Sequence, residues 1–156
     1  MSRRLFITSL LFMLLSPGLC RAADEKPKMK GPITVTSGML SVDNKEHTAL
    51  FEKNVVAKTS DMTMAADKML IFYKEGSGDV TKIEASGNVR MFKETRAITS
   101  QNATYYADGE KVVFTGEPKA IDGENVVTGS LMTYFIKEDR SSIENSRVFL
   151  KNRKDK

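Results

Sequence analysis

The chain has few of the residues on which enzyme sites are usually built. Its 156 residues include no tryptophan, one cysteine (Cys20) and one histidine (His47). An activated nucleophile needs a neighbouring base, and a catalytic metal needs a set of His, Cys or carboxylate ligands. An enzyme would therefore need some other convergent polar cluster, and the sequence offers none. We expect no enzyme activity, no catalytic residue and no cofactor.

Two groups of candidate metal ligands are better explained as ordinary structure. Asp43, Glu46 and His47 lie within one short segment, but polar residues populate such turns without any metal. Met62 and Met64 lie two residues apart, as a thioether pair for copper(I) would, but core packing is the favoured interpretation. We therefore expect no metal site.

The longest apolar run, from Leu5 to Leu15, falls short of the roughly 20 residues needed to span a bilayer. It follows a basic start and ends before a Pro-Gly break, which is typical of a secretory signal peptide. Residues 1–22 are predicted to be this peptide, cleaved after Ala22, and residues 23–31 a flexible linker. An uncleaved membrane anchor is the alternative.

Charge and cysteine content limit the partners and the means of stabilisation. Residues 31–150 contain 14 Lys or Arg and 17 Asp or Glu, and a basic tail covers residues 151–156. A nucleic-acid-binding domain carries a basic stripe on its folded body, so we expect no nucleic acid partner. Cys20 leaves with the signal peptide, so stability must come from burial and strand pairing without a disulfide.

Two related phrases repeat along the chain in one register. The first set is spaced by 29, 34 and 29 residues and the second by 34 and 29. Fixed-period self-similarity marks a repeat architecture in which each unit buries its apolar face on its neighbours, so the function should belong to the stack of units. The first phrase starts at Val35, Met64, Ile98 and Val127, and the second at Phe51, Ala85 and Phe114.

The apolar pattern predicts an all-β domain over residues 32–150. Apolar residues alternate with polar ones, and no stretch of about 11 residues keeps helical spacing. Leu70 and Phe72 are expected to share a strand face with Met62, Met64 and Ala66. Glycines inside two of the runs, at positions 87 and 116, indicate bends that curl the sheet into a sandwich or an open, groove-like roll.

Methionine is the unusual component of these apolar faces. The chain without its signal peptide keeps seven. Methionine side chains are flexible and adapt to variable apolar partners, so they suit a groove for acyl chains, although they can equally fill the core of a small sandwich. The seven are Met29, Met39, Met62, Met64, Met69, Met91 and Met132.

The repeated phrases resemble those of the OstA/LptA family of lipopolysaccharide-transport proteins. The resemblance covers about residues 31–150. Lys53 departs from the glycine usual at that position, and Glu117-Pro118 departs from the family's Asn-Val. The most specific matches are residues 51–55 (FEKNV), 64–69 (MAADKM) and 113–116 (VFTG), which are similar to the family's F-x-G-N-V, I-x-A-D-K and V-x-L-T-G.

This resemblance implies a fold, a cargo and a set of partners. It implies an open, V-shaped β-jellyroll that carries lipopolysaccharide by its acyl chains across the periplasm, from the inner to the outer membrane. Its implied partners are the lipid A part of lipopolysaccharide, the jellyroll domains of LptC and LptD, and further copies stacked end to end. The implied acyl-chain lining is Ile33, Val35, Phe51, Val55, Leu70, Phe72, Ile83, Val89, Met91, Phe114, Met132 and Tyr134. The implied partner edges are Ile33, Thr34 and Val35 at one end and Ser146, Arg147, Val148, Phe149 and Leu150 at the other.

Three alternatives stay open at this point. A membrane-anchored component like LptC would share the jellyroll but keep its N-terminal helix. A purely structural periplasmic scaffold would have a closed core and bind no lipid. An enzyme of envelope metabolism ranks last.

Overall fold

The computed structural model describes residues 32–151, all as strands, turns and connecting segments. The predicted signal peptide, the predicted linker up to residue 31 and the tail beyond Lys151 lie outside these residues. Within residues 32–151 there is no helix long and apolar enough to cross a membrane. The strands are β1 (Thr34–Thr36), β2 (Met39–Asp43), β3 (Thr48–Lys58), β4 (Thr63–Tyr73), β5 (Val80–Lys93), β6 (Arg96–Tyr106), β7 (Lys111–Thr115), β8 (Lys119–Asp122), β9 (Asn125–Thr128), β10 (Leu131–Phe135), β11 (Arg140–Glu144) and β12 (Arg147–Phe149).

All strands belong to one antiparallel sheet. β1 and β2 both pair with β3, and β7 and β8 both pair with β6, so each couple is one long strand interrupted in its middle. The couples β9–β10 and β11–β12 are interrupted in the same way. The sheet is therefore an up-and-down meander of long strands.

The interruptions line up across the sheet as a single fold line, which we call the crease. At the crease the pairing register shifts between Glu52 and Val55 in β3 and between Ser86 and Val89 in β5. Consecutive residues there adopt positive φ, a left-handed conformation that L-residues rarely take. These pairs are Lys53 and Asn54 (φ 68° and 55°), Gly87 and Asn88 (77° and 48°), and Gly116 and Glu117 (76° and 59°).

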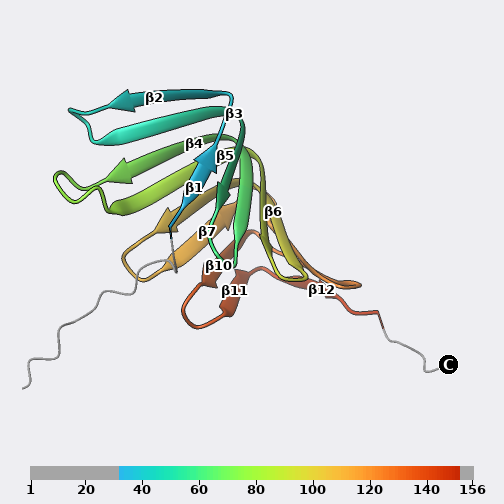
Figure 1. The fold of residues 1–156 in the computed structure, drawn as a ribbon. Coiled ribbons are helices and arrows are strands. Elements are labelled where there is room, and N and C mark those ends of the chain that lie inside the picture. Colours follow the sequence, from blue (N-terminus) through green and yellow to red (C-terminus); the bar gives the residue numbers. More distant parts are fainter. Residues whose placement is uncertain (1–31, 152–156) are drawn as a thin grey trace, which may run out of the picture.

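The crease divides the sheet into two walls that diverge like a V. In Figure 1 the strands of one wall, called wall A below, run to the left from the crease, and those of the other, called wall B, run downward. Wall A consists of β2, residues 48–52, 68–73, 80–86 and 102–106 of β3 to β6, and β7, β10 and β11. Wall B consists of β1, residues 55–58, 63–66, 89–93 and 96–100 of β3 to β6, and β8, β9 and β12.

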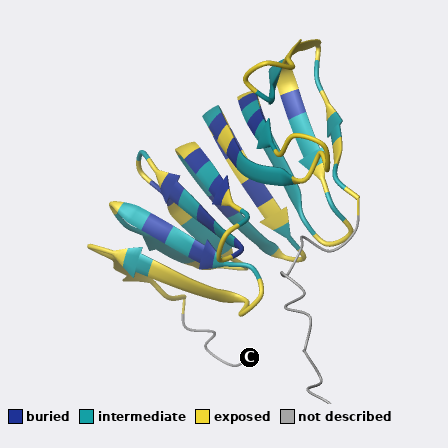
Figure 2. Ribbon diagram, turned by 90° about the vertical axis from the view of Figure 1, so that its left-hand side faces the viewer, coloured by how far each residue is buried: buried dark blue, intermediate teal, exposed yellow. Residues whose placement is uncertain are grey.

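The repeated phrases of the sequence form rows of side chains on the inner faces of these walls. Directly paired residues share a sheet face, so the pairing register defines each row. Figure 2 shows buried residues in the strands between the two ends of the sheet and exposed residues at both ends. One row of wall B is Val35, Ala57, Met64, Met91, Ile98, Ala120 and Val127, and it contains all four starts of the first phrase. The matching row of wall A is Phe51, Met69, Ala85, Ala103, Phe114, Met132 and Ile143.

The outer face of wall A carries a different row, in which aromatic and cationic residues alternate. The ammonium group of Lys82 lies 4.0 Å from the ring centroid of Phe72. Lys111 lies 5.6 Å from the ring of Tyr106, and the guanidinium of Arg140 lies 4.2 Å from that of Phe135. The row runs without interruption across the wall as Phe72, Lys82, Tyr106, Lys111, Phe135 and Arg140.

The prediction that Leu70 and Phe72 share a face with Met62, Met64 and Ala66 was wrong. On β4 one residue, Asp67, lies at the crease between the paired residues of the two walls. The alternation of inward and outward side chains therefore shifts by one position there. The buried residues after the crease are Met69 and Ile71, and the positions between them turn outward. Leu70 and Phe72 therefore lie on the outer face of wall A.

The crease predicts a selective sensitivity at Gly87. A Cβ atom there would meet the carboxylate of Asp67, which accepts a hydrogen bond of 2.8 Å from the amide of Asn88. Gly109 has a similar φ (82°) but nothing within 4 Å of an added Cβ. We expect Gly87→Ala to lower the free energy of unfolding by about 2–4 kcal/mol, and Gly109→Ala by only about 1–2 kcal/mol, because only the first adds a clash to the backbone strain. Urea unfolding of both variants checks this, and equal losses would contradict the crease clash.

Candidate functional site

The inner faces of the two walls enclose an apolar groove that runs across the strands. A cleft near its middle receives side chains from both walls, with methionines prominent among them. Its size and shape depend on flexible thioether chains, which repack at low cost around apolar groups. The cleft is lined by Ile33, Ala57, Met62, Met64 and Met91 from the wall B side and by Met69, Ile83, Tyr105, Val112 and Ile136 from the wall A side, with Thr59 at its border.

The structure places nearly all of the predicted lining residues on the inner faces. Val35 and Phe51 are partly buried against the core, and Ile33 borders the cleft. Leu70 and Phe72 are the exceptions, since they lie outside. The buried members are Val55, Ile83, Val89, Met91, Phe114, Met132 and Tyr134.

Sequence reasoning missed several inner residues, most clearly Met69 and Ile71 on β4. Their burial follows from the phase change at Asp67, which period-two counting ignores. The repeat carried a usable signal, because Met69 and Met132 lie at equivalent distances after the phrase starts at Met64 and Val127. Transferring the face of Met132 to its counterpart would have placed Met69 inside.

A polar cluster joins the free rims of the two walls, and we call it the clasp. Arg96 and Lys93 come from the β5–β6 hairpin of wall B, while Tyr134 and Asp139 come from β10 and the β10–β11 turn of wall A. Arg96 Nη2 donates to both carboxylate oxygens of Asp139, at 3.0 and 2.9 Å. Lys93 Nζ donates to Tyr134 Oη at 2.8 Å and to Asp139 Oδ1 at 3.2 Å, and Tyr134 Oη donates to the same oxygen at 2.7 Å.

These contacts stabilise the carboxylate of Asp139 and the ammonium of Lys93. Hydrogen bonds from Arg96, and then from Tyr134 and Lys93, hold the pKa of Asp139 well below its ordinary value of 3.8. The hydrogen bond to Tyr134 raises the pKa of Lys93, and burial raises that of Tyr134. Asp139 is therefore ionised and Lys93 protonated at neutral pH.

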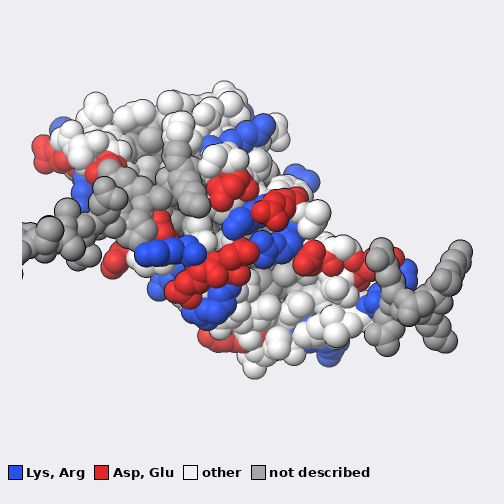
Figure 3. All heavy atoms as spheres, turned by 60° about the horizontal axis from the view of Figure 1, so that its bottom comes forward, with Lys and Arg blue, Asp and Glu red and all other residues white. Residues whose placement is uncertain are grey.

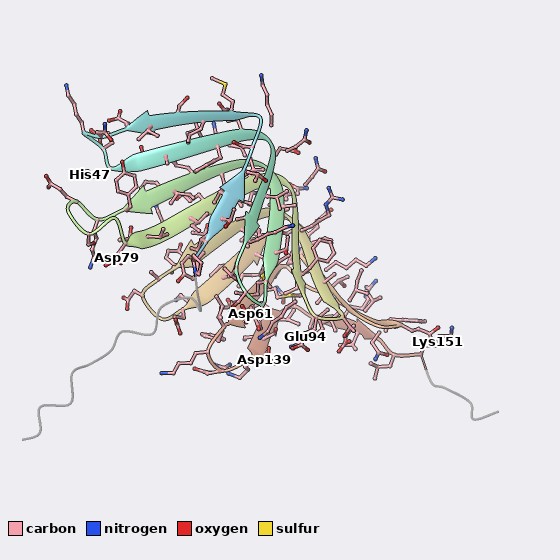
Figure 4. The ribbon with its side chains drawn as sticks, viewed as in Figure 1. His47, Asp61, Asp79, Glu94, Asp139 and Lys151 are labelled. Atoms are coloured by element: carbon pink, nitrogen blue, oxygen red, sulfur yellow. The ribbon has the colours of Figure 1, made fainter. Side chains whose placement is uncertain are left out.

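No pattern in the sequence indicated the clasp. Arg96 and Asp139 are separated by 43 residues and lie in different hairpins. Tyr134 was expected only as an apolar lining residue, yet its ring faces the groove side of the sheet while its hydroxyl reaches the rim. Figure 4 labels Asp139 in the β10–β11 turn and Glu94 in the β5–β6 turn.

A second cleft opens beside the clasp. Its apolar part is formed by Met91, Ile98, Ala120 and Val127 of wall B. Lys93, Arg96 and Tyr134 of the clasp lie at its border. The remaining lining residues are Ala97, Ile121, Asp122, Asn125 and Ser141. Apolar surface and paired cations thus meet in one cleft.

The two ends of the sheet present unpaired strand edges within the described residues. β1, which holds the predicted edge residues Thr34 and Val35, pairs with β3 alone, and β12 pairs with β9 alone. β2 forms the same end of wall A, a position that sequence reasoning did not identify. The large exposed apolar side chains at these ends are Met39, Leu40 and Val42 on β2 and Val148, Phe149 and Leu150 at or just after β12.

The model of the LptA/(LptD N-terminal domain) LPS transport protein family matches residues 34–140. The chain belongs to this family. The resemblance drawn from the repeated phrases is therefore confirmed.

The solved structure of a distant relative has the same fold. LptH from Pseudomonas aeruginosa, described as the LptA homologous periplasmic component of a conserved lipopolysaccharide transport device, superposes with a TM-score of 0.71. The superposition covers 81% of this chain and 100% of LptH at 12% sequence identity. The open β-jellyroll predicted for the family is thus confirmed.

An uncharacterised protein, R00383, from Rhizobium meliloti (strain 1021) is a closer relative in sequence. It is 28% identical over 106 residues, which make up 63% of this chain. The matched region spans 57% of the length of that protein.

The turn considered as a metal site in this LptA-family member has ordinary hydrogen bonding. Asp43 Oδ1 accepts bonds from the backbone N–H groups of Lys45 and Glu46, at 2.9 and 3.1 Å. His47 Nε2 lies 3.7 Å from a carboxylate oxygen of Glu75. Across residues 32–151 no group of three or more His, Cys, Asp or Glu residues is placed to hold a metal ion.

The clasp predicts a characteristic dependence of stability on pH. A carboxylate whose pKa is lowered by folding stabilises the folded state above its unfolded pKa, and this contribution disappears as the pH falls through the folded pKa. We therefore expect Asp139→Asn to melt below the wild type at about pH 7 and still at about pH 4, and the gap to close only in stronger acid. Thermal unfolding of both proteins across this pH range checks it.

Glu138→Gln is the matched control for this prediction. Glu138 is the adjacent carboxylate and pairs with exposed Arg140 at 2.9 Å. Exposed pairs contribute little, so its melting temperature should stay within about 3 °C of the wild type. A gap for Asp139→Asn that closes already near pH 4 would show that Asp139 is not held ionised by the clasp.

Proposed function

We propose that this chain is a periplasmic carrier that holds the acyl chains of lipopolysaccharide between walls A and B. The observation that supports this most directly is the pair of facing apolar rows, open along one side and joined by a cleft that both walls line. Membership of a lipopolysaccharide-transport family makes an acyl chain the natural occupant. The function requires binding and release of a lipid without any covalent chemistry.

The physical chemistry of the groove suits several flexible hydrocarbon tails. Transferring a methylene group from water to an apolar site stabilises it by about 0.8 kcal/mol, so a few buried tail segments are enough for micromolar binding. Met62, Met64, Met69 and Met91 can adjust their rotamers to tails of different length. The sugar part would stay outside, along the open side of the V.

We further propose that copies stack end to end and that the stack joins the inner to the outer membrane. An exposed strand edge with unpaired backbone groups can be extended by another strand. The β1–β2 end of one molecule would pair with the β11–β12 end of the next, which continues both walls and the groove. The same edges would accept the jellyroll domains of LptC and LptD.

Site-specific photo-crosslinking tests the lipid groove. Phe51 is partly buried on the inner row, while its neighbour Glu52 faces out and lies 3.7 Å from Lys68. A benzophenone side chain at position 51 should therefore crosslink to lipopolysaccharide in cells, and one at position 52 should not. Adducts are detected with an antibody against lipopolysaccharide.

The same experiment distinguishes the proposal from a lipid-free scaffold. A folded, correctly exported variant at position 51 that yields no adduct, with the same outcome at Met64, would mean that the groove is a closed core. Equal adducts at positions 51 and 52 would indicate non-specific association with the lipid.

End-to-end stacking is tested by placing a charge on the β12 edge. Phe149 is 63% exposed on the edge strand, and Phe92 is 46% exposed on an interior strand. We expect Phe149→Asp to weaken self-association at least about tenfold, because a buried charge at a sheet edge opposes strand addition. Phe92→Asp should leave self-association unchanged. Sedimentation velocity measures both, and equal behaviour of the two variants would refute pairing through β12.

A further inference from the structure

The clasp contains more positive than negative charge. Lys93 and Arg96 both contact a single carboxylate, that of Asp139. The other carboxylates near this rim, Glu94 and Asp122, make no hydrogen bond to either cation within the described residues. Asp139 is therefore the carboxylate that both cations contact, while Asp122, directly opposite Arg96 on the neighbouring strand, and Glu94, in the same hairpin turn, add negative charge nearby.

The geometry of the two cations suits a tetrahedral oxyanion as well as a carboxylate. Arg96 approaches both oxygens of Asp139 at 2.9 and 3.0 Å, and Lys93 adds a third donor at 3.2 Å to one of them. A phosphate group offers three acceptor oxygens and up to two negative charges, and Arg with Lys is the combination that recognises it. A phosphate at the position of the carboxylate would neutralise both cations.

The carboxylate is the member of the clasp that is easiest to displace. The Asp139 side chain is 49% exposed and lies in a turn, whereas Arg96 is 35% exposed and Lys93 only 14% exposed. The two cations lie at the ends of long strands, β5 and β6, which are paired along their length. Figure 3, in which the bottom of Figure 1 comes forward, shows acidic and basic side chains intermixed across the middle of this face.

Directly beneath the cations lies the apolar cleft of wall B. Met91 and Ile98 of that cleft are each two residues away from a clasp cation along the same strand, so their side chains share its inner face. A ligand that bridges the two parts must carry an anion next to hydrocarbon. That is the chemistry of a phosphorylated lipid.

We propose that Lys93 and Arg96 form a phosphate-binding subsite at the rim of the groove, and that Asp139 is a resident carboxylate which the phosphate of a bound lipid displaces. This inference rests on the proposed function and adds to it the recognition of the headgroup. Because Asp139 belongs to wall A and the cations to wall B, the displacement also opens the clasp. Binding of the phosphate and separation of the two walls at the clasp are then a single event.

The first test removes the resident carboxylate. Asp139→Asn keeps the size of the side chain but no longer competes as an anion. We expect it to bind lipid A that carries both phosphates about five- to tenfold more tightly than the wild type, because a charge-assisted contact no longer has to be broken. Arg96→Gln should bind the same lipid about tenfold more weakly. Displacement of a bound fluorescent fatty acid measures all three proteins.

The second test changes the ligand and leaves the protein intact. The same lipid A after enzymatic removal of its phosphates should bind wild type, Asp139→Asn and Arg96→Gln with equal affinity. If the gain in Asp139→Asn persists without phosphates, the subsite is wrong. If the dephosphorylated lipid does not bind the wild type at all, the groove itself is wrong, so the two failures are distinguishable.

Inorganic phosphate separates a lipid subsite from a site for the free anion. It should compete with phosphorylated lipid A only at millimolar concentration, since it lacks the apolar contacts. Competition at micromolar concentration would assign the subsite to free phosphate and overturn the lipid proposal. Glu138→Gln, which lies in the same turn and pairs with Arg140 on the outer face, should bind every ligand as the wild type does.

Opening of the clasp can be followed directly by electron–electron distance measurement. Spin labels at positions 94 and 138, each at a hairpin tip next to the clasp, report the separation of the two rims in a Cys20→Ser background. Phosphorylated lipid A should lengthen or broaden this distance, and the dephosphorylated lipid should not. An unchanged distribution with saturating phosphorylated lipid would show that Asp139 is never displaced.

Discussion

Left-handed backbone at the crease is the constraint on which the remaining structure depends. An L-residue at positive φ costs about 1–2 kcal/mol, yet β3 places Lys53 and Asn54 there in succession. The cost is offset because each crossing lets one sheet fold onto itself while its strands remain paired on both sides. A flat sheet of the same strands would expose its entire apolar face to water. Gly87 and Gly116 reduce the conformational cost at two crossings. Glycine is suited there also because an added Cβ would clash with Asp67 or Gln101.

Folding along one line also determines which distant residues meet. The tip of the β5–β6 hairpin of wall B reaches the β10–β11 turn of wall A because the sheet is folded back on itself along the crease. The result is a groove whose interior is apolar and whose rim is bridged by four polar side chains. Apolar side chains and two cations thus occupy neighbouring positions at this rim.

The all-β class, the repeat and most of the inner-face residues could be predicted from the sequence, because alternation and period are local properties that every strand repeats. Val35 and Met64 were identified as equivalent positions, and they do share one row of wall B. Leu70 was placed on the wrong face because a single crossing residue near Asp67 reverses the alternation, which no local count reveals. The clasp was not predicted, because the contact between Arg96 and Asp139 depends on the angle between the walls and not on any spacing in the chain.

The alternating aromatic and cationic row on the outer face of wall A has a consequence for crowding. Phe72, Tyr106 and Phe135 would otherwise form an apolar ribbon on the outside of the sheet, but each ring has a cation over it. Two molecules that met flank to flank would have to dehydrate these cations, which is unfavourable. Lateral bundling is thereby suppressed while the strand edges stay available. Contacts between molecules are left to the unpaired strand edges at the two ends of the described sheet.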